Sequence, residues 1–277
     1  MKNFDYLKKE VRQLSNTLKA NPAYLFIFVV LFFIIIYTAA TLGTWIFSIL
    51  PGIAISYYIY WRDKYDQEPY EKLLLAFFLG AVSTYPAMKM EEYGVYDLEI
   101  TPYTDLKTTF LFSFFVIALS EEWIKLLFLR VFIMPGKDFN ERMDGIVYSV
   151  MISMGFATME NILYIIFRDG GMNVAIIRMF TAVPAHASFA ILMGYFAGLW
   201  HFEKRKGKKL IYLLLTLFVP LAVHGLYDFF IFQDLSDYLI IFTGVTLISS
   251  LLLGHYLMNY HIYNSHKAQN KKSKIPI

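Results

Sequence analysis

The sequence predicts an all-α polytopic membrane protein with about eight transmembrane helices in one bundle and an amphipathic helix before them. Of the 277 residues, 57% are apolar, whereas only 17% are charged. Soluble domains of this size are about a quarter charged. The charges are also bunched between long apolar runs, which is typical of a chain that crosses a bilayer repeatedly.

Eight apolar runs approach the length of about 20 residues that crosses a bilayer as a helix. They lie near residues 22–41, 43–61, 73–88, 109–134, 145–167, 179–200, 210–231 and 238–260. The first two are so close together that we expect a tight helical hairpin, and the third is short enough to be re-entrant. We therefore predict a transmembrane domain over residues 21–260 and a disordered basic cytoplasmic tail over residues 261–277.

Residues 1–20 are predicted to form a cytoplasmic amphipathic helix. Its apolar residues alternate spacings of three and four and so share one helix face: Phe4, Leu7, Val11, Leu14 and Leu18. The apolar run that follows is too long for a cleavable signal peptide. Such a helix lies on the membrane surface.

Lysine and arginine indicate the orientation. With the amino terminus inside, the inner segments hold 20 of the 25 basic residues, Lys125 lies within a span, and the outer loops hold only Lys89, Lys107, Arg168 and Arg178. Basic residues favour the cytoplasmic side. We therefore expect both termini in the cytoplasm and the loop at 89–108 outside.

Composition excludes several classes of function. Without cysteine there is no disulfide, thiol nucleophile or cysteine-ligated metal. A net charge of +3 is too small to indicate binding to nucleic acid. The acids of the outer loop, including Glu91 and Glu92, are interpreted as a solvated surface.

Four spans carry ionisable or amide side chains at depths where lipid would otherwise surround them. In chain order these are Glu121, Glu122 and Lys125, then Glu160 and Asn161, then His186, then His224 and Asp228. A charge at the bilayer centre costs about 3 kcal/mol or more, so each needs a partner or a function. Glu160, His186 and His224 lie about seven residues from the outer ends of their spans, or about 10 Å deep, so they share one level.

Spacing predicts which of these groups cooperate. Glu121 and Lys125 stand four apart on one helix face, and so do His224 and Asp228. Glu122 adjoins Glu121, and two adjacent carboxylates cannot easily both stay ionised in a low dielectric, so we expect one to be prepared for proton transfer. One such pair alone is equally explained as a polar clamp between helices, but four spans together favour a shared site.

A stripe of small residues accompanies the histidine of the sixth span. His186, Ala190, Gly194 and Gly198 follow one another at a spacing of four. Stripes of this kind let another helix approach closely, so His186 is expected to face protein rather than lipid.

Together the four segments resemble the PrsW family of intramembrane proteases, which is related to the CAAX-processing and bacteriocin-processing membrane proteases. The matching motifs are E-E-x-x-K at Glu121, Glu122 and Lys125, G-F-x-x-x-E-N at Gly155, Phe156, Glu160 and Asn161, the histidine His186, and H-x-x-x-D at His224 and Asp228. Glu68 and Pro69 are similar to the family's acidic E-P segment, although Tyr70 departs from a stricter E-P-E form. The resemblance covers residues 50–232.

This resemblance implies an endopeptidase that cleaves membrane-anchored proteins, such as anti-sigma factors, near the extracytoplasmic side of the bacterial cytoplasmic membrane. It also implies that Lys125 tunes the acidic pair. Two mechanisms stay open. In the first, Glu160, His186 and His224 hold a divalent metal such as zinc, which lowers the pKa of water.

The second mechanism needs no metal. Glu121 or Glu122, helped by Glu160, would activate water, while His224 and Asp228 stabilise the oxyanion. No H-E-x-x-H occurs, so the common zinc-protease helix is absent.

Two other classes of function remain as alternatives. A proton-coupled secondary transporter also carries intramembrane acids and histidines, but no internal duplication of the motifs is evident. A non-catalytic membrane scaffold of the same superfamily is the other, and the intact acidic and histidine motifs argue against it.

Overall fold

The computed structural model describes residues 22–102, 105–167 and 171–272, and every regular element within them is helical. The elements are α2 (Pro22–Arg62), α3 (Tyr70–Tyr96), α4 (Leu106–Leu111), the π-helix η1 (Phe112–Ala118), α5 (Leu119–Phe128), the π-helix η2 (Leu129–Ile133), α6 (Arg142–Phe167), α7 (Gly171–Phe180), α8 (Ala182–Phe202), α9 (Lys206–Phe232), the 3-10 helix η3 (Asp237–Ile240) and α10 (Ile241–Lys272). The all-α prediction is confirmed. The predicted amphipathic helix over 1–20 lies outside the described residues.

Six helical stretches of the described chain are long and apolar enough to cross a membrane. They are Thr41–Arg62, Tyr70–Tyr96, Arg142–Phe167, Gly171–Phe202, Lys206–Phe232 and Asp237–Lys267. The fourth predicted span is also helical, because α4, η1, α5 and η2 follow one another without a break from Leu106 to Ile133. The protein is therefore a polytopic helical membrane protein, although the number of eight spans is not confirmed.

The predicted hairpin between the first two spans is wrong, because α2 runs without interruption from Pro22 to Arg62. Gly43 is the only strong helix destabiliser between residues 38 and 46, and one glycine in an apolar run costs about 1 kcal/mol relative to alanine. That cost is too small to end a helix.

Two further expectations about helix ends are also wrong. α3 continues to Tyr96, so the third span is neither short nor re-entrant, and Glu91 and Glu92 lie on a helix. α10 continues to Lys272, so the tail is helical rather than disordered over 261–272. Lysine, glutamate and glutamine are good helix formers, so a hydropathy pattern ends before the helix does.

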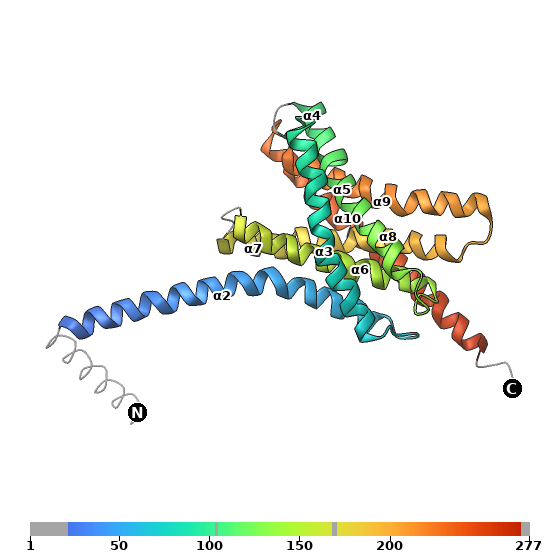
Figure 1. The fold of residues 1–277 in the computed structure, drawn as a ribbon, viewed down its shortest axis with the longest axis horizontal. Helices are drawn as coiled ribbons and strands as arrows, with labels where there is room; N and C mark the ends of the chain where they lie inside the picture. Colours follow the sequence, from blue (N-terminus) through green and yellow to red (C-terminus); the bar gives the residue numbers. More distant parts are fainter. Residues whose placement is uncertain (1–21, 103–104, 168–170, 273–277) are drawn as a thin grey trace, which may run out of the picture. The chain divides into compact units, whose positions relative to one another are not determined.

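The contacts divide the chain within α2 into two units, Met1–Ile46 and Phe47–Ile277. All candidate site residues belong to the second unit. There α6 packs against α3 and α8, α8 packs against α9, and α10 packs against α8 and α9 (Figure 1). Helices α5, α6, α8 and α9 carry the four motifs, and α3 packs against α5 and α6.

Glycines allow the central helices to touch through their backbones. A Cβ atom at Gly194 of α8 would lie 2.3 Å from the carbonyl oxygen of Gly145 in α6. The expectation that the small-residue stripe faces another helix is confirmed. A Cβ atom at Gly155 of α6 would lie 1.8 Å from the carbonyl oxygen of Phe77 in α3. Because α3, α6 and α8 are so close, polar side chains in the interior can reach one another.

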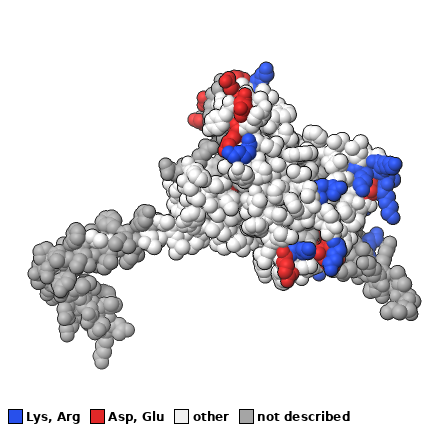
Figure 2. All heavy atoms as spheres, viewed as in Figure 1, with Lys and Arg blue, Asp and Glu red and all other residues white. Residues whose placement is uncertain are grey.

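The surface of the second unit fits a lipid environment. On the face shown in Figure 2, charged side chains gather in separate groups, and a broad uncharged area lies between them. Large apolar side chains are exposed on several helices, among them Leu74, Phe78 and Leu252. Soluble proteins rarely expose large contiguous apolar patches, so this surface faces the hydrocarbon of a membrane.

Candidate active site

Helix α5 places two carboxylates and one lysine in the interior of the bundle. Glu121, Glu122 and Lys125 are each at most 5% exposed. Lys125 Nζ lies 2.9 Å from Glu121 Oε2 and 2.9 Å from Glu122 Oε1. The predicted pair at a spacing of four is confirmed, and a spacing of three adds the second contact. One ammonium group thus offsets the repulsion that we expected between two adjacent carboxylates.

Two π-helical segments enclose α5 along the chain, η1 before it and η2 after it. Such segments are rare and often occur at functional sites, because they re-aim the side chains that follow. These π-helical segments were not predicted from the sequence. A continuous apolar run carries no periodic signal that separates π-helix from α-helix.

His224 and Asp228 of α9 lie beside the acidic pair. His224 Nδ1 is 2.9 Å from Glu122 Oε1, and His224 Nε2 is 3.3 Å from Asp228 Oδ2. Both ring nitrogens thus face carboxylate oxygens, which accept hydrogen bonds when ionised. The arrangement is fully satisfied when the imidazole carries a proton on each nitrogen.

His186 of α8 joins the lysine to the acid of α6. Its Nδ1 is 3.2 Å from Lys125 Nζ, and its Nε2 is 3.0 Å from Glu160 Oε2. Because an ammonium group only donates and an ionised carboxylate only accepts, the network assigns the lone pair to Nδ1 and the proton to Nε2. The ring centroids of His186 and His224 are 5.5 Å apart. The polar residues of all four spans therefore form one cluster.

Glu160 and Asn161 of α6 both contact an arginine outside the four motifs. Arg178 Nη2 of α7 lies 2.8 Å from Glu160 Oε2, and Arg178 Nε lies 2.6 Å from Asn161 Oδ1. Asn161 Nδ2 in turn lies 3.4 Å from the carbonyl oxygen of Ser48. Arg178 was predicted to lie among the outer-loop charges, since its position near a span end gave no sign that its side chain turns into the bundle.

Glu91 of α3 is a second residue whose surroundings were not predicted from the sequence. It is half-buried and interacts electrostatically with Glu121, Glu160 and His224. It was assigned to a solvated loop because the apolar run ends before it. The extension of α3 to Tyr96 instead brings its carboxylate near the cluster.

Aromatic side chains wall the cluster. The Phe156 ring of the G-F motif lies 4.2 Å from Lys125 Nζ, and the Phe189 ring stacks on His224 at 4.7 Å between centroids. These rings are each 1% exposed. They keep bulk water away, and electrostatic interactions are stronger in the resulting low dielectric.

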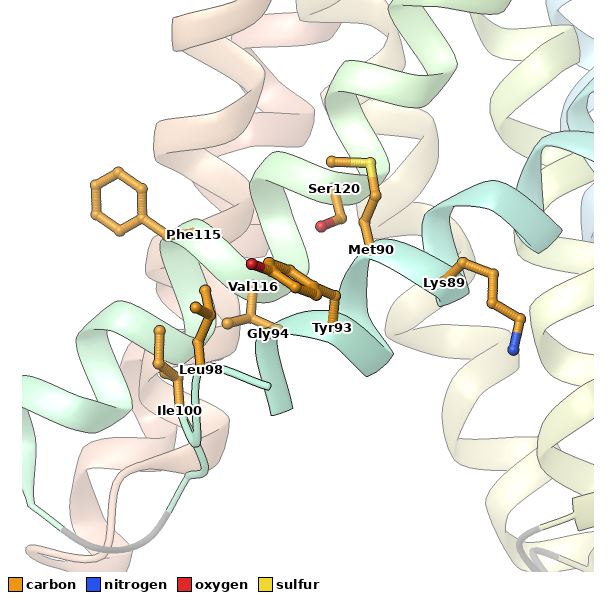
Figure 3. Close-up of a pocket in the computed structure, with 9 residues that line it drawn as sticks. All are labelled: Lys89, Met90, Tyr93, Gly94, Leu98, Ile100, Phe115, Val116 and Ser120. Atoms are coloured by element: carbon orange, nitrogen blue, oxygen red, sulfur yellow. The ribbon is translucent and has the colours of Figure 1, made fainter. Parts of the chain in front are cut away.

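A groove with a volume of about 350 Å³ lies between the end of α3 and η1 (Figure 3). Most of its lining is apolar, and Lys89, Tyr93 and Ser120 are its polar residues. Figure 3 shows Tyr93 and Gly94 of α3 against Val116 of η1. Ser120, which lines the groove, directly precedes Glu121 in α5.

Three buried side chains offer ligand atoms that suit a metal ion. One atom from each of Glu121, His186 and His224 lies within 4.8 Å of the others. Two of the three ligands that we predicted belong to this set. The third, Glu160, does not, and its carboxylate contacts Arg178 and His186 instead.

The chemistry of the donors fits a divalent cation. A carboxylate with two imidazoles is a common ligand set for catalytic zinc. Glu160 and Glu122 each contact the ring of one of these histidines, as the carboxylates that orient metal-bound histidines do. Among the described residues, the four carboxylates of the cluster, those of Glu121, Glu122, Glu160 and Asp228, contact two permanent cations, Lys125 and Arg178, so the cluster can accommodate two further positive charges.

The E-P segment lies far from this cluster. Tyr148 of α6 donates a hydrogen bond to Glu68, and Tyr148 precedes Glu160 by twelve residues, or about 18 Å along the helix. Desolvation by burial raises the pKa of Asp63 to about 8 and that of Glu68 to about 7. The segment therefore fastens the loop between α2 and α3 to α6.

The fold and the cluster together define a class of protein. A lipid-facing helical bundle that holds buried carboxylates, histidines and a lysine in mutual contact is a membrane protein with an acid–base site inside the bilayer.

Comparisons with known proteins identify the family. The model of the PrsW family intramembrane metalloprotease matches residues 68–253, more than half of the chain. Protease PrsW of Bacillus subtilis (strain 168) is 38% identical over 192 residues, which cover 69% of this chain and 84% of that protein. Protease PrsW of Clostridioides difficile (strain 630) is 34% identical over 190 residues, covering 68% and 79%. No solved structure matches. The chain belongs to the PrsW family of intramembrane metalloproteases, and all four motifs lie within the matched residues.

Proposed function

We propose that this chain is an intramembrane endopeptidase that cleaves membrane-anchored proteins, such as anti-sigma factors, near the extracytoplasmic side of the bilayer. The observation that carries the proposal is the contact network of Lys125 with Glu121, Glu122 and His186, joined by His224, in the interior of a lipid-facing bundle. Burying so many charges in a membrane is costly unless they act together. Hydrolysis of a peptide bond needs such a set of acids and bases.

The residues divide the work of hydrolysis between them. Glu121 or Glu122 accepts a proton from the attacking water, and Lys125 holds both carboxylates in place. The same carboxyl group then gives this proton to the leaving amine, while His224 and Asp228 stabilise the developing oxyanion. The groove beside Ser120 receives the chain of the substrate next to the bond that is cut.

A divalent metal such as zinc would be held by Glu121, His186 and His224. When bound, it supplies a Lewis acid that polarises the peptide carbonyl and lowers the pKa of water. Glu160, which we predicted as a ligand, would then orient His186 by accepting its Nε2 proton.

We further propose that the protein resides in the bacterial cytoplasmic membrane, with the loop at 97–105 outside and residues 62–69 and the carboxyl terminus in the cytoplasm. The asymmetry of basic residues supports this orientation. Because α2 is continuous, the cytoplasmic placement of residues 1–20 needs its own test. The chain has no cysteine, so single cysteines at Asn3, Asp97 and Gln269 can be labelled in intact cells with an impermeant reagent. Labelling at Asp97 and none at Gln269 is expected, labelling at Gln269 contradicts the orientation, and labelling at Asn3 would place residues 1–20 outside.

Cleavage in cells tests the function itself. The chain is co-expressed with a library of single-span proteins of the anti-sigma type, and fragments are compared between wild type and Glu121→Gln. Fragments that appear only with wild type support the protease. Transport without cleavage would favour the proton-coupled transporter, and binding without cleavage would favour the scaffold.

A further inference from the structure

We propose that Arg178 is a positioning residue of this site, which holds Glu160 and Asn161 so that Glu160 keeps the proton of His186 on Nε2. The cleavage measurements that test this role rest on the proposed function. The four motifs do not include this arginine.

The contacts of Arg178 reach both residues of the E-N pair at once. The guanidinium places Nη2 2.8 Å from Glu160 Oε2 and Nε 2.6 Å from Asn161 Oδ1. The Nε contact is a hydrogen bond to Asn161, whereas the Nη2 contact is an ion pair with Glu160 in which Nη2 makes no hydrogen bond to any described residue. A planar guanidinium can hold both partners at once, which a single ammonium group cannot. Arg178 therefore sets the orientation of both side chains rather than adding only charge.

Burial and stacking fix the arginine in turn. Its side chain is 14% exposed, and its guanidinium carbon lies 4.0 Å from the centre of the Tyr164 ring. Cation–π contact of this kind stabilises a desolvated guanidinium. The side chain is thus confined on one side by the ring of Tyr164 and on the other by the carboxylate of Glu160.

Helix α7 carries Arg178 into the bundle. Ile177 and Phe180 are exposed on α7, whereas Ala175, three residues before Arg178, is buried. Residues three apart share a helix face, so the face with Ala175 and Arg178 packs inward, against α6 and α8. Helix α7 thus positions the Arg178 side chain in the interior.

Glu160, which is held by Arg178, in turn orients His186. The same oxygen, Oε2, lies 2.8 Å from Arg178 Nη2 and 3.0 Å from His186 Nε2. Without the arginine, the Glu160 carboxylate is free to rotate toward Lys125, and His186 loses the acceptor that keeps its proton on Nε2. The Nδ1 lone pair, which faces Lys125 and Glu121, is then no longer fixed.

Arg178→Met tests the proposal against a matched control. Losing a group that orients an active-site histidine costs roughly 10- to 100-fold in activity. We expect kcat to fall by that factor with KM changed less than about threefold, because the proposed role of Arg178 acts through Glu160 and His186 rather than on the substrate. Arg130→Met is the control, since the Arg130 guanidinium also lies over a ring, 5.3 Å from the centre of Trp200, but Arg130 itself is exposed. It should cleave like wild type.

Rescue separates positioning from simple packing. Added guanidinium should restore part of the kcat of Arg178→Met, and methylammonium should not. Arg178→Lys should be intermediate, because lysine keeps the charge beside Glu160 but not the second contact to Asn161. Unchanged kcat in folded Arg178→Met, or an equal loss in Arg130→Met, overturns the proposal. The proposal is also overturned if added guanidinium restores none of the kcat of Arg178→Met and Arg178→Lys loses as much kcat as Arg178→Met.

A measurement without substrate keeps the proposal separate from the proposed function. Nitrogen-15 spectra of histidine-labelled protein, with His186 assigned by His186→Gln, should show a protonated Nε2 in wild type and a changed His186 signal in Arg178→Met. If this holds while wild type cleaves nothing, the positioning role stands and the protease function fails. If wild type cleaves and the His186 signal does not respond to Arg178→Met, the positioning role fails alone.

Discussion

Replacing Lys125 by methionine removes the one ammonium group that contacts both carboxylates of α5 and His186. Two unit charges 4 Å apart attract by about 4 kcal/mol at an effective dielectric constant of about 20. Removing one partner of a buried ion pair typically costs about 3–5 kcal/mol, because the other charge stays buried without compensation. We expect Lys125→Met to lower the free energy of unfolding by about 3–5 kcal/mol and to abolish cleavage.

Unfolding in mixed detergent micelles, followed by tryptophan fluorescence, measures this free energy. Lys89→Met is the matched control, since Lys89 also pairs with a glutamate three residues away but is 53% exposed. Exposed pairs contribute about 1 kcal/mol or less, so this change should be nearly neutral. Adding Glu122→Gln to Lys125→Met should recover part of the stability without restoring cleavage. If Lys125→Met costs no more than Lys89→Met, the role of Lys125 as the cation of the acidic pair is refuted.

Further changes probe packing, pH and metal. Gly155→Val should prevent folding, because its Cβ would lie 1.8 Å from the carbonyl oxygen of Phe77, whereas Gly207→Val, with nothing within 4 Å, should elute as folded protein in size-exclusion chromatography. The pKa values of Asp63 and Glu68 are raised in the folded protein, to about 8 and about 7, so the folded state binds protons more tightly than the unfolded chain does. This contribution to stability is fully present below about pH 4 and is lost as the pH rises through about 7 to 8. The thermal midpoint should therefore fall across this range, and Glu68→Gln should flatten the fall; an equal slope in both proteins contradicts the assignment. Stripping metal from purified protein with a strong chelator should stop cleavage, and zinc should restore it; full activity in metal-free protein favours the carboxylate–water mechanism.

The membership of the cluster could be predicted because a bilayer penalises isolated charge. Glu121, Lys125, Glu160, His186 and His224 stood out as ionisable groups within apolar runs. The depth from the span ends placed Glu160, His186 and His224 at one level. Charged side chains that lie within the hydrocarbon of a bilayer need polar partners, so the positions of these residues within apolar runs were enough to predict that they cluster. The local spacing of four then gave the pairs within each helix.

What could not be predicted lies at the ends of the spans. Arg178 and Glu91 are close enough to the membrane surface that a long side chain is stable pointing either outward or inward. Hydropathy marks where apolar residues stop, not where a helix stops, which is why α3 and α10 extend past their predicted ends. The π-helical turns beside α5 depend on tertiary packing, which no local pattern records.

Cleavage of a membrane-anchored substrate by the purified protein in liposomes tests the central claim most directly. The rates of fragment formation are compared for wild type, Glu121→Gln, His224→Ala and Asp228→Asn, with mass spectrometry locating the cut. We predict that the first two changes each lower the rate at least about a hundredfold while the protein stays folded, because the cluster acts as a unit. Asp228→Asn should be milder, since an amide can still hold His224 by a hydrogen bond. Wild-type rates in both Glu121→Gln and His224→Ala, on a substrate that wild type cleaves, would contradict the claim that this buried cluster is the catalytic site.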